Sequence, residues 1–236
     1  MKARERLIVA LDTQTFEEAS KLIDVLSPEV DVFKVGIAPF TGFGEKLLEK
    51  LAEENKKVFL DLKVHDIPNT VKNAAKLAAE KNIFMMNFHC VGGEEMLVSA
   101  AQGAQDGATE GKGPILLGVT ILTSMTEEAM KNIGLAGSVE DKVLEFANTA
   151  KRAGLNGVVA SAKEAKAIRA ALGDDFVIVT PGVRPEWAAK GDQKRVLTPK
   201  QAIAEGADYI VVGRPIIQAD DPLEAAKKII SEMEEE

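Results

Sequence analysis

The chain has 236 residues, of which 46% are hydrophobic and 28% are charged, as is typical of a soluble globular protein. Its net charge of -8 argues against a general affinity for nucleic acids or anionic membranes, although local basic groups could still bind an anionic ligand. Because Cys90 is the only cysteine, the sequence excludes an intramolecular disulfide and a cysteine zinc site, and it favours a cytoplasmic location. The apolar run at residues 7–11 is too short for a signal peptide, and we expect no membrane span.

Eight short apolar runs predict eight strands, at residues 7–11, 31–36, 58–62, 83–89, 114–120, 156–160, 176–180 and 207–213. Several runs are continuously apolar rather than alternating, which is typical of parallel strands that are covered on both faces. Amphipathic segments predict helices between them, at residues 15–27, 70–82, 139–154, 161–173 and 222–236. Gly154 and Gly173 end two of these segments, and glycine is the residue that is favoured at the C-terminus of a helix.

This alternation predicts an α/β fold, a single (β/α)8 TIM barrel, and an open doubly wound sheet is the alternative. No linker divides the chain, so we expect one domain over residues 1–236. Two connections are longer than the rest, at residues 121–138 and 181–199, and both follow predicted strands. Long loops at this face of a barrel are candidates for lids or binding loops.

A charged cluster ends the third predicted strand, in the stretch VFLDLKVHDIPNT at residues 58–70. Asp61 and Lys63 are two residues apart, so they should share one face of the strand and point to the barrel axis. Lys34 lies late in the neighbouring predicted strand, at residues 31–36, and should reach the same point. We expect Lys63 to keep its charge because Asp61 and Asp66 flank it. A buried ion network is a poor route to stability, which favours a function for this cluster.

Further polar residues follow other predicted strands, where all of them would meet at one mouth of the barrel. Asp12 follows the first strand, and Thr123 with Ser124 follows the fifth. Loops after the seventh and eighth strands of such barrels often bind phosphate, and here they carry arginine, glutamine and glycine residues that could do so. These are Gly182, Arg184, Gln193, Arg195, Gly213 and Arg214. His65 and His89 have no partners at metal-ligand spacing, so the sequence predicts no metal site.

The stretch DLKVHDIPNT at residues 61–70 resembles the DxKxxDIPxT signature of the orotidine 5'-monophosphate decarboxylase family. The segments IVALD, FKVG, GVTILTSM, TPGVRP…GDQKR and IVVGRPI are similar to the other family motifs, in the same order. The resemblance implies decarboxylation of orotidine 5'-monophosphate to UMP, the last step of de novo pyrimidine nucleotide synthesis. It also implies a cytoplasmic homodimer with shared active sites and no metal or organic cofactor.

The resemblance further implies a role for each matching residue. Lys63 would donate a proton to C6 of the pyrimidine, and Asp61 with Lys34 would complete the charged array. Asp66 and Thr70 would act across the homodimer interface. The implied substrate-binding set is Asp12, Lys34, Asp61, Leu62, Lys63, Val64, His65, Asp66, Ile67, Pro68, Asn69, Thr70, Thr123, Ser124, Arg184, Gln193, Gly213 and Arg214.

Within that set the ligand would be divided into three parts. Asp12 and Lys34 would hold the ribose hydroxyls, and Ser124 beside Thr123 would read the amide edge of the pyrimidine. The 5'-phosphate would be held by Arg184, Gln193, Gly213 and Arg214.

Two other functions stay open at this point. One is a metal-dependent sugar-phosphate decarboxylase or aldolase of the same barrel suprafamily, since such enzymes share a DxKxxD core. The IPNT and LTS segments favour the pyrimidine enzyme over this alternative. The other is a barrel that binds nucleotides without catalysis, which would have no reason to keep Lys63.

Overall fold

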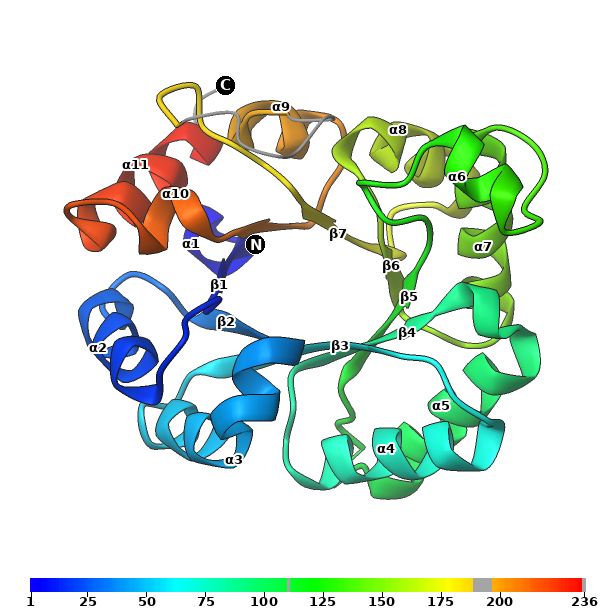
Figure 1. Cartoon of the computed structure of the whole chain (residues 1–236), viewed down its shortest axis with the longest axis horizontal. Coiled ribbons are helices and arrows are strands. Elements are labelled where there is room, and N and C mark those ends of the chain that lie inside the picture. The colour runs from blue at the N-terminus through cyan, green and yellow to red at the C-terminus, as the bar shows by residue number, and fades with distance from the viewer. Residues whose placement is uncertain (110, 189–196, 235–236) are drawn as a thin grey trace.

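The computed structural model describes residues 1–109, 111–188 and 197–234. Eight parallel strands pair in chain order, and β1 pairs with β8, so that the sheet closes into a barrel surrounded by helices (Figure 1). The strands are β1 Leu7–Ala10, β2 Val32–Gly36, β3 Lys57–Val64, β4 Met85–His89, β5 Ile115–Val119, β6 Gly157–Val159, β7 Val177–Pro181 and β8 Tyr209–Val212. The predicted (β/α)8 barrel is confirmed, and the open doubly wound sheet is excluded.

Helix α1 precedes β1, and the other helices follow strands and surround the barrel (Figure 1). They are α1 Ala3–Arg6, α2 Phe16–Leu26, α3 Ile37–Glu53, α4 Pro68–Glu80, α5 Glu94–Gly107, α6 Glu127–Asn132, α7 Val139–Arg152, α8 Ala162–Leu172, α9 Pro199–Ala204, α10 Arg214–Ile217 and α11 Pro222–Glu234, with a short 3-10 helix η1 at Cys90–Gly92. All five predicted helices are present. The prediction of a loop over residues 121–138 needs correction, because α6 lies within it.

Local sequence explains where several helices begin and end. The side chains of Thr15, Ser138 and Ser161 cap α2, α7 and α8 by accepting a backbone N–H from the first turn. Pro68 occupies the first turn of α4, as predicted, and Gly173 ends α8 with a φ of +82°. In the part of the chain that the structure describes, none of the helices combines the length and the apolar character needed to cross a membrane.

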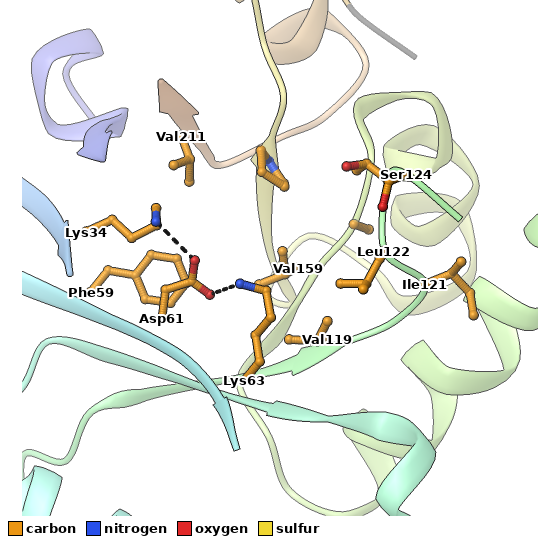
Figure 2. Close-up of a pocket in the computed structure, with 13 residues that line it drawn as sticks. Lys34, Phe59, Asp61, Lys63, Val119, Ile121, Leu122, Ser124, Val159 and Val211 are labelled. Carbon is orange, nitrogen blue, oxygen red and sulfur yellow. Dashed lines mark hydrogen bonds and ion pairs between the residues drawn. The ribbon is translucent and has the colours of Figure 1, made fainter. Parts of the chain in front are cut away.

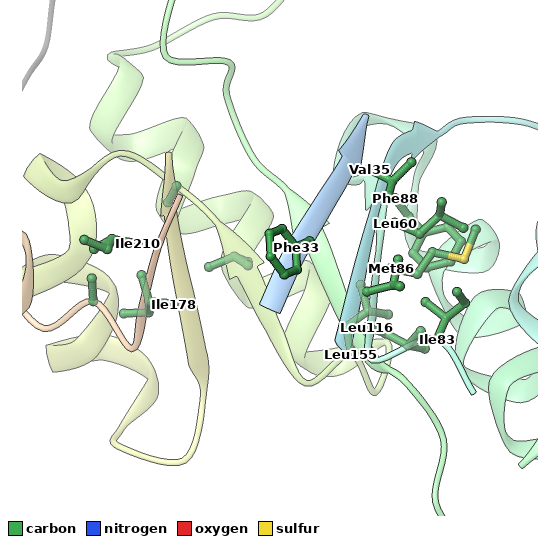
Figure 3. Close-up of a cluster of buried hydrophobic side chains, with 14 of the residues drawn as sticks. Phe33, Val35, Leu60, Ile83, Met86, Phe88, Leu116, Leu155, Ile178 and Ile210 are labelled. Carbon is green, nitrogen blue, oxygen red and sulfur yellow. The ribbon is translucent and has the colours of Figure 1, made fainter. Parts of the chain in front are cut away.

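Two apolar layers result from the alternation of side chains along the strands. The inner layer fills the barrel and comprises Ile8, Ala10, Val32, Phe59, Met85, Leu117, Val179, Tyr209 and Val211. Figure 2 shows Phe59 and Val211 of this layer in a pocket that the charged residues also line. The outer layer packs between strands and helices and includes Phe33, Val35, Leu60, Met86 and Ile178 (Figure 3). On β2, Phe33 and Val35 face outward, so Lys34 between them faces the barrel interior. On β3, Leu60 faces outward, so the next residue, Asp61, faces the interior as well.

Helices α4 and α5 approach each other closely because α5 carries glycines on the facing side. A Cβ atom added at Gly103 would overlap the backbone carbonyl oxygen of Lys72, and one at Gly107 would overlap that of Lys76. A larger residue at either position would have to push the two helices apart.

We therefore expect Gly103→Ala to lower the free energy of unfolding by at least roughly 1–3 kcal/mol, the usual cost of overpacking. Urea unfolding followed by circular dichroism would measure the change. Gly42→Ala is the matched control, because a Cβ atom there meets no atom within 4 Å. Equal losses of stability in the two variants would contradict this account of the α4–α5 contact.

Candidate active site

The pocket lies at the mouth formed by the carboxyl ends of the strands, where the sequence placed the candidate residues. Its lining includes Lys34 from β2, Asp61 and Lys63 from β3, and Thr123 and Ser124 from the loop after β5. Apolar residues complete the wall: Phe59, Val119, Ile121, Leu122, Val159, Ala160, Pro181 and Val211. In Figure 2, Ser124 lies across the pocket from the charged residues of β2 and β3.

Four charged side chains alternate in sign across one side of this mouth. Lys34 Nζ lies 3.3 Å from Asp12 Oδ1 and 3.3 Å from Asp61 Oδ2, and Lys63 Nζ lies 2.6 Å from Asp61 Oδ1. The side chains of Lys34 and Asp61 are each 12% exposed, against 30% for Lys63 and 57% for Asp12. The interior end of the array is therefore largely removed from water, which strengthens the electrostatic interactions there.

The array determines the ionisation of Asp61. Burial alone raises the pKa of this carboxyl group, but the positive charges of Lys34 and Lys63, with hydrogen bonds from Lys63 and Asn87, outweigh burial and hold the pKa below its usual range. Asp61 is therefore an anion at neutral pH, held between two ammonium groups. An arrangement of this kind has a fixed field that can act on charge in a bound ligand.

Asn87 joins this array and was not predicted from the sequence. It lies on β4, is fully buried, and donates a hydrogen bond from Nδ2 to Asp61 Oδ1 over 2.7 Å. Its Oδ1 accepts the backbone N–H of Lys63 over 2.8 Å. The sequence contained one indication of this role, because Asn87 is a polar residue inside the apolar run at 83–89 and lies two positions from the inward-facing Met85.

The backbone at Lys63 departs from regular strand geometry. Its φ is +51°, in the left-handed region that a residue with a side chain seldom adopts. The pairing of β3 with β4 also shifts register here, since Leu60 pairs with Met86 and Val64 with Phe88. Strand alternation predicted correctly that the Lys63 side chain reaches the barrel interior, but it did not predict this irregularity.

The segment after Lys63 leaves the pocket. Leu62 and Val64, on either side of Lys63, pack against the outer apolar layer, and His65 and Asp66, which follow them, are exposed. Asp66 Oδ1 accepts the backbone N–H of Ile67 over 2.7 Å, and among the described residues it forms no ion pair with Lys63. The expectation that Asp66 flanks Lys63 is therefore wrong within one chain, because the backbone turns away to begin α4.

Other expected members of this segment lie at the start of α4. Ile67, Asn69 and Thr70 are exposed and Pro68 is partly buried, and none of the four lines the pocket of its own chain. The structure thus separates residues 65–70 from the array that Lys63 joins.

The residues expected to bind phosphate follow β7 and β8. Arg184 comes three residues after the end of β7 and is buried, while Gly213 and Arg214 directly follow β8. A Cβ atom added at Gly213 would lie 3.4 Å from Ala10 Cβ and 3.7 Å from Asp12 Oδ2, so this backbone passes close to the charged array. Gln193 and Arg195 lie outside the described residues.

The two histidines lie near each other, with ring centroids 6.2 Å apart. Burial lowers the pKa of His89, and the nearby His65 and Lys63 lower it further. Within residues 1–109, 111–188 and 197–234, no three His, Cys, Asp or Glu side chains are grouped so that they could hold a metal ion.

Comparison with known proteins gives one consistent result. The sequence model described as "Orotidine 5'-phosphate decarboxylase / HUMPS family" matches residues 5–229. A protein of Heliobacterium modesticaldum named orotidine 5'-phosphate decarboxylase is 48% identical over 238 residues, which cover 100% of this chain and 98% of that protein. The protein of that name from Syntrophomonas wolfei is 46% identical, with full coverage of both chains.

Among solved structures, orotidine 5'-phosphate decarboxylase from Lactobacillus acidophilus superimposes with a TM-score of 0.87 at 39% identity. The match covers 98% of this chain and 100% of that structure. The similarity therefore extends over the whole barrel and includes every strand that contributes to the pocket.

The lowered pKa of Asp61 predicts how stability depends on pH. A carboxyl group whose pKa is lower in the folded than in the unfolded chain stabilises the fold above its unfolded value of about 3.9, and that contribution is lost as the pH falls through the folded value. Asp61→Asn should therefore lower the free energy of unfolding at pH 7 by roughly 1–3 kcal/mol, less than for a fully buried pair because Lys63 stays partly exposed. The deficit should stay nearly constant from pH 7 to about pH 5 and shrink from there to about pH 3, as the pH falls toward the folded value.

Urea unfolding of both proteins at several pH values in this range would measure the deficit. Asp24→Asn serves as the control, because Asp24 forms an ion pair of 2.6 Å with Lys50 but its side chain is 56% exposed. We expect a much smaller effect there, since solvent screens exposed pairs. A deficit for Asp61→Asn that stays constant with pH would show that ionisation of Asp61 is not its cause.

Proposed function

The chain belongs to the orotidine 5'-phosphate decarboxylase / HUMPS family, and on this premise we propose that it is a carbon–carbon lyase that converts orotidine 5'-monophosphate into UMP and CO2. The observation that carries the proposal is the array of Asp12, Lys34, Asp61 and Lys63 at the mouth of the barrel. UMP is a pyrimidine nucleotide, so this reaction would complete de novo pyrimidine nucleotide synthesis, in the cytoplasm.

Lys63 would act on the charge that the reaction creates. When the bond between C6 and the carboxylate breaks, the electron pair stays on C6 in an orbital that the ring delocalises poorly. The ammonium group of Lys63 stabilises this developing charge and then transfers a proton to C6, and water restores the proton on Lys63. At an effective dielectric constant of about 20, opposite unit charges ~4 Å apart attract by roughly 4 kcal/mol.

Asp61 would have two effects on the same step. It fixes Lys63 Nζ through the contact of 2.6 Å, and it repels a substrate carboxylate that is bound beside it. That repulsion ends as CO2 leaves, so it destabilises the bound substrate relative to the transition state. Lys63 supplies both the positive charge and the proton, and the proposed mechanism therefore needs no metal or organic cofactor.

The charged array cannot provide the whole acceleration. Typical enzymes lower barriers by ~8–23 kcal/mol, several times the interaction of one ion pair. Binding of the remote parts of the nucleotide must contribute by holding C6 against Lys63. We assign the ribose hydroxyls to Asp12 and Lys34, and the amide edge of the pyrimidine to Thr123 and Ser124, which line the opposite wall.

The 5'-phosphate is assigned to the ends of β7 and β8. Arg184 and Arg214 offer guanidinium groups there, and Gly213 lets its backbone come close to a ligand. Gln193 belongs to the same proposed phosphate site, although it lies outside the described residues.

Asp66 and Thr70 are assigned to the active site of a second subunit. Both are exposed and neither lines the pocket of its own chain, which supports a role across the interface of a homodimer. His65, Ile67, Pro68 and Asn69 would accompany them at that interface, while Leu62 and Val64 hold the strand beneath Lys63.

The activity is tested directly by the loss of orotidylate absorbance in the presence of EDTA, where we expect undiminished turnover. Activity that disappears with EDTA and returns with Mg2+ would instead favour a metal-dependent sugar-phosphate decarboxylase or aldolase.

The role of Lys63 is tested by Lys63→Ala, which should lower kcat by at least about 10²–10⁴-fold, the usual contribution of a positioned acid. UMP affinity, measured by calorimetry, should survive in this variant. Near-normal turnover of Lys63→Ala would refute the role of Lys63.

Shared active sites are tested by mixing two inactive variants, Lys63→Ala and Asp66→Asn. In a mixed dimer one site carries both substitutions and the other carries neither. Subunit exchange at equal concentrations should therefore restore up to about a quarter of wild-type activity. A mixture that stays inactive, although mass spectrometry detects mixed dimers, would exclude sharing through Asp66.

A further inference from the structure

The side chain of Asn87 occupies a break in the pairing between β3 and β4. From Leu60 to Val64 the chain of β3 advances four residues, while its partners Met86 and Phe88 are two residues apart. The backbone N–H of Lys63, inside this break, donates to Asn87 Oδ1 over 2.8 Å. An amide side chain thus provides the acceptor that regular strand pairing would otherwise supply.

We propose that Asn87 is a positioning residue that holds Lys63 and Asp61 in the relative geometry that decarboxylation requires. The inference rests on the proposed function, because the array has a catalytic role only if the chain turns over orotidylate. Asn87 Nδ2 donates to Asp61 Oδ1, the same oxygen that lies 2.6 Å from Lys63 Nζ. One amide therefore fixes the backbone of Lys63 and the carboxylate that its side chain contacts.

The two partners determine which way the amide points. The Lys63 backbone N–H can only donate, so it must face the amide oxygen, and the ionised carboxylate of Asp61 can only accept, so it must face the NH2 group. The hydrogen bond to Asp61 is buried and the one from Lys63 is partly buried, and the Asn87 side chain itself has no exposed surface. A flipped amide would break both bonds at once, and this leaves Asn87 a single orientation.

The backbone conformation of Lys63 explains why its hydrogen bond to Asn87 is needed. A left-handed φ of +51° costs a residue with a side chain about 1–3 kcal/mol, and it persists only where the surroundings hold it. Without the hydrogen bond to Asn87, the backbone could return to the extended region. That rotation would redirect the Lys63 side chain and move Nζ away from Asp61.

The neutrality of the amide also matters at this position. The charged or titratable groups near Asn87 are Asp61 and Lys63 from β3, Lys34 from β2 through Asp61, and His89 on β4 itself. The facing strand β5 contributes only Leu117 and Val119 on this side. An anion in place of the amide would repel Asp61 and compete with it for the lysines.

The first test is Asn87→Ala, for which we expect kcat to fall about 10²-fold, as a displacement of order 1 Å of a catalytic group can cause. UMP affinity should change little, because Asn87 holds the array and does not itself line the pocket. Asn156→Ala is the matched control. Asn156 Oδ1 also accepts a strand N–H over 2.8 Å, from Leu116, but far from the mouth, so its loss should leave kcat unchanged.

The second test is Asn87→Asp, which separates positioning from a general effect on folding. A protonated carboxyl group offers a carbonyl acceptor and an O–H donor, and so reproduces both hydrogen bonds of the amide. The ionised form has no donor and adds a negative charge beside Asp61. We therefore expect kcat of this variant, divided by that of the wild type at each pH, to rise as the pH falls. Titration of His89 affects both proteins and largely cancels in this ratio.

The inference is overturned if Asn87→Ala keeps kcat within a few-fold of wild type, or if the ratio for Asn87→Asp does not change with pH. An inactive wild-type protein would refute the proposed function instead. In that case hydrogen exchange at the Lys63 amide decides the structural part of the inference. Exchange should accelerate in Asn87→Ala, which removes the acceptor, but not in Asn156→Ala, and unchanged protection in Asn87→Ala would overturn it.

Discussion

The carboxylate of Asp61 is the group on which the site depends. Burial alone would favour its neutral form, yet the two lysines that contact it keep it ionised. In return, Asp61 separates Lys34 from Lys63, which would otherwise repel each other at the same mouth. Such an arrangement stabilises a fold poorly, because desolvation offsets much of the attraction. Its position at the carboxyl ends of the strands, where barrel enzymes have their active sites, supports the catalytic role that we propose for it.

The barrel provides this array with a rigid backbone and with an apolar layer beneath it that excludes water. Phe59 lies inside the barrel directly before Asp61 on the same face of β3, and Leu60 between them packs outward under the helices. A shift of one residue would send the charges into the outer apolar layer. The backbone is also locally irregular, since Lys63 takes a left-handed conformation where β3 and β4 lose their pairing. Regular strand packing thus positions the site, and the irregular backbone at Lys63 directs the side chain of this lysine.

Prediction from the sequence succeeded where a local pattern carried the information. All eight strands lie within or beside the apolar runs, because a buried parallel strand is recognisable by its continuous apolar character. Helix α5 was not identified as a helix, because Gly103 and Gly107 interrupt the helical pattern, and their purpose is the close contact with α4. The short α6 was assigned to a loop because six residues carry too little periodicity. Asn87 was overlooked because one asparagine in an apolar strand has no chemical pattern around it.

The sequence by itself determined the fold class, the family resemblance, and the shared face of Asp61 and Lys63, because a period of two residues is a local property of a strand. Only the tertiary structure decided which groups meet that face. Asn87 lies 24 residues from Lys63 and 26 from Asp61 along the chain, and Lys34 lies 22 from Asp12. Asp66, only three residues from Lys63, turns away instead, because α4 begins at Pro68. Contacts between strands depend on register and on closure of the barrel, and these are set by the packing of the whole chain.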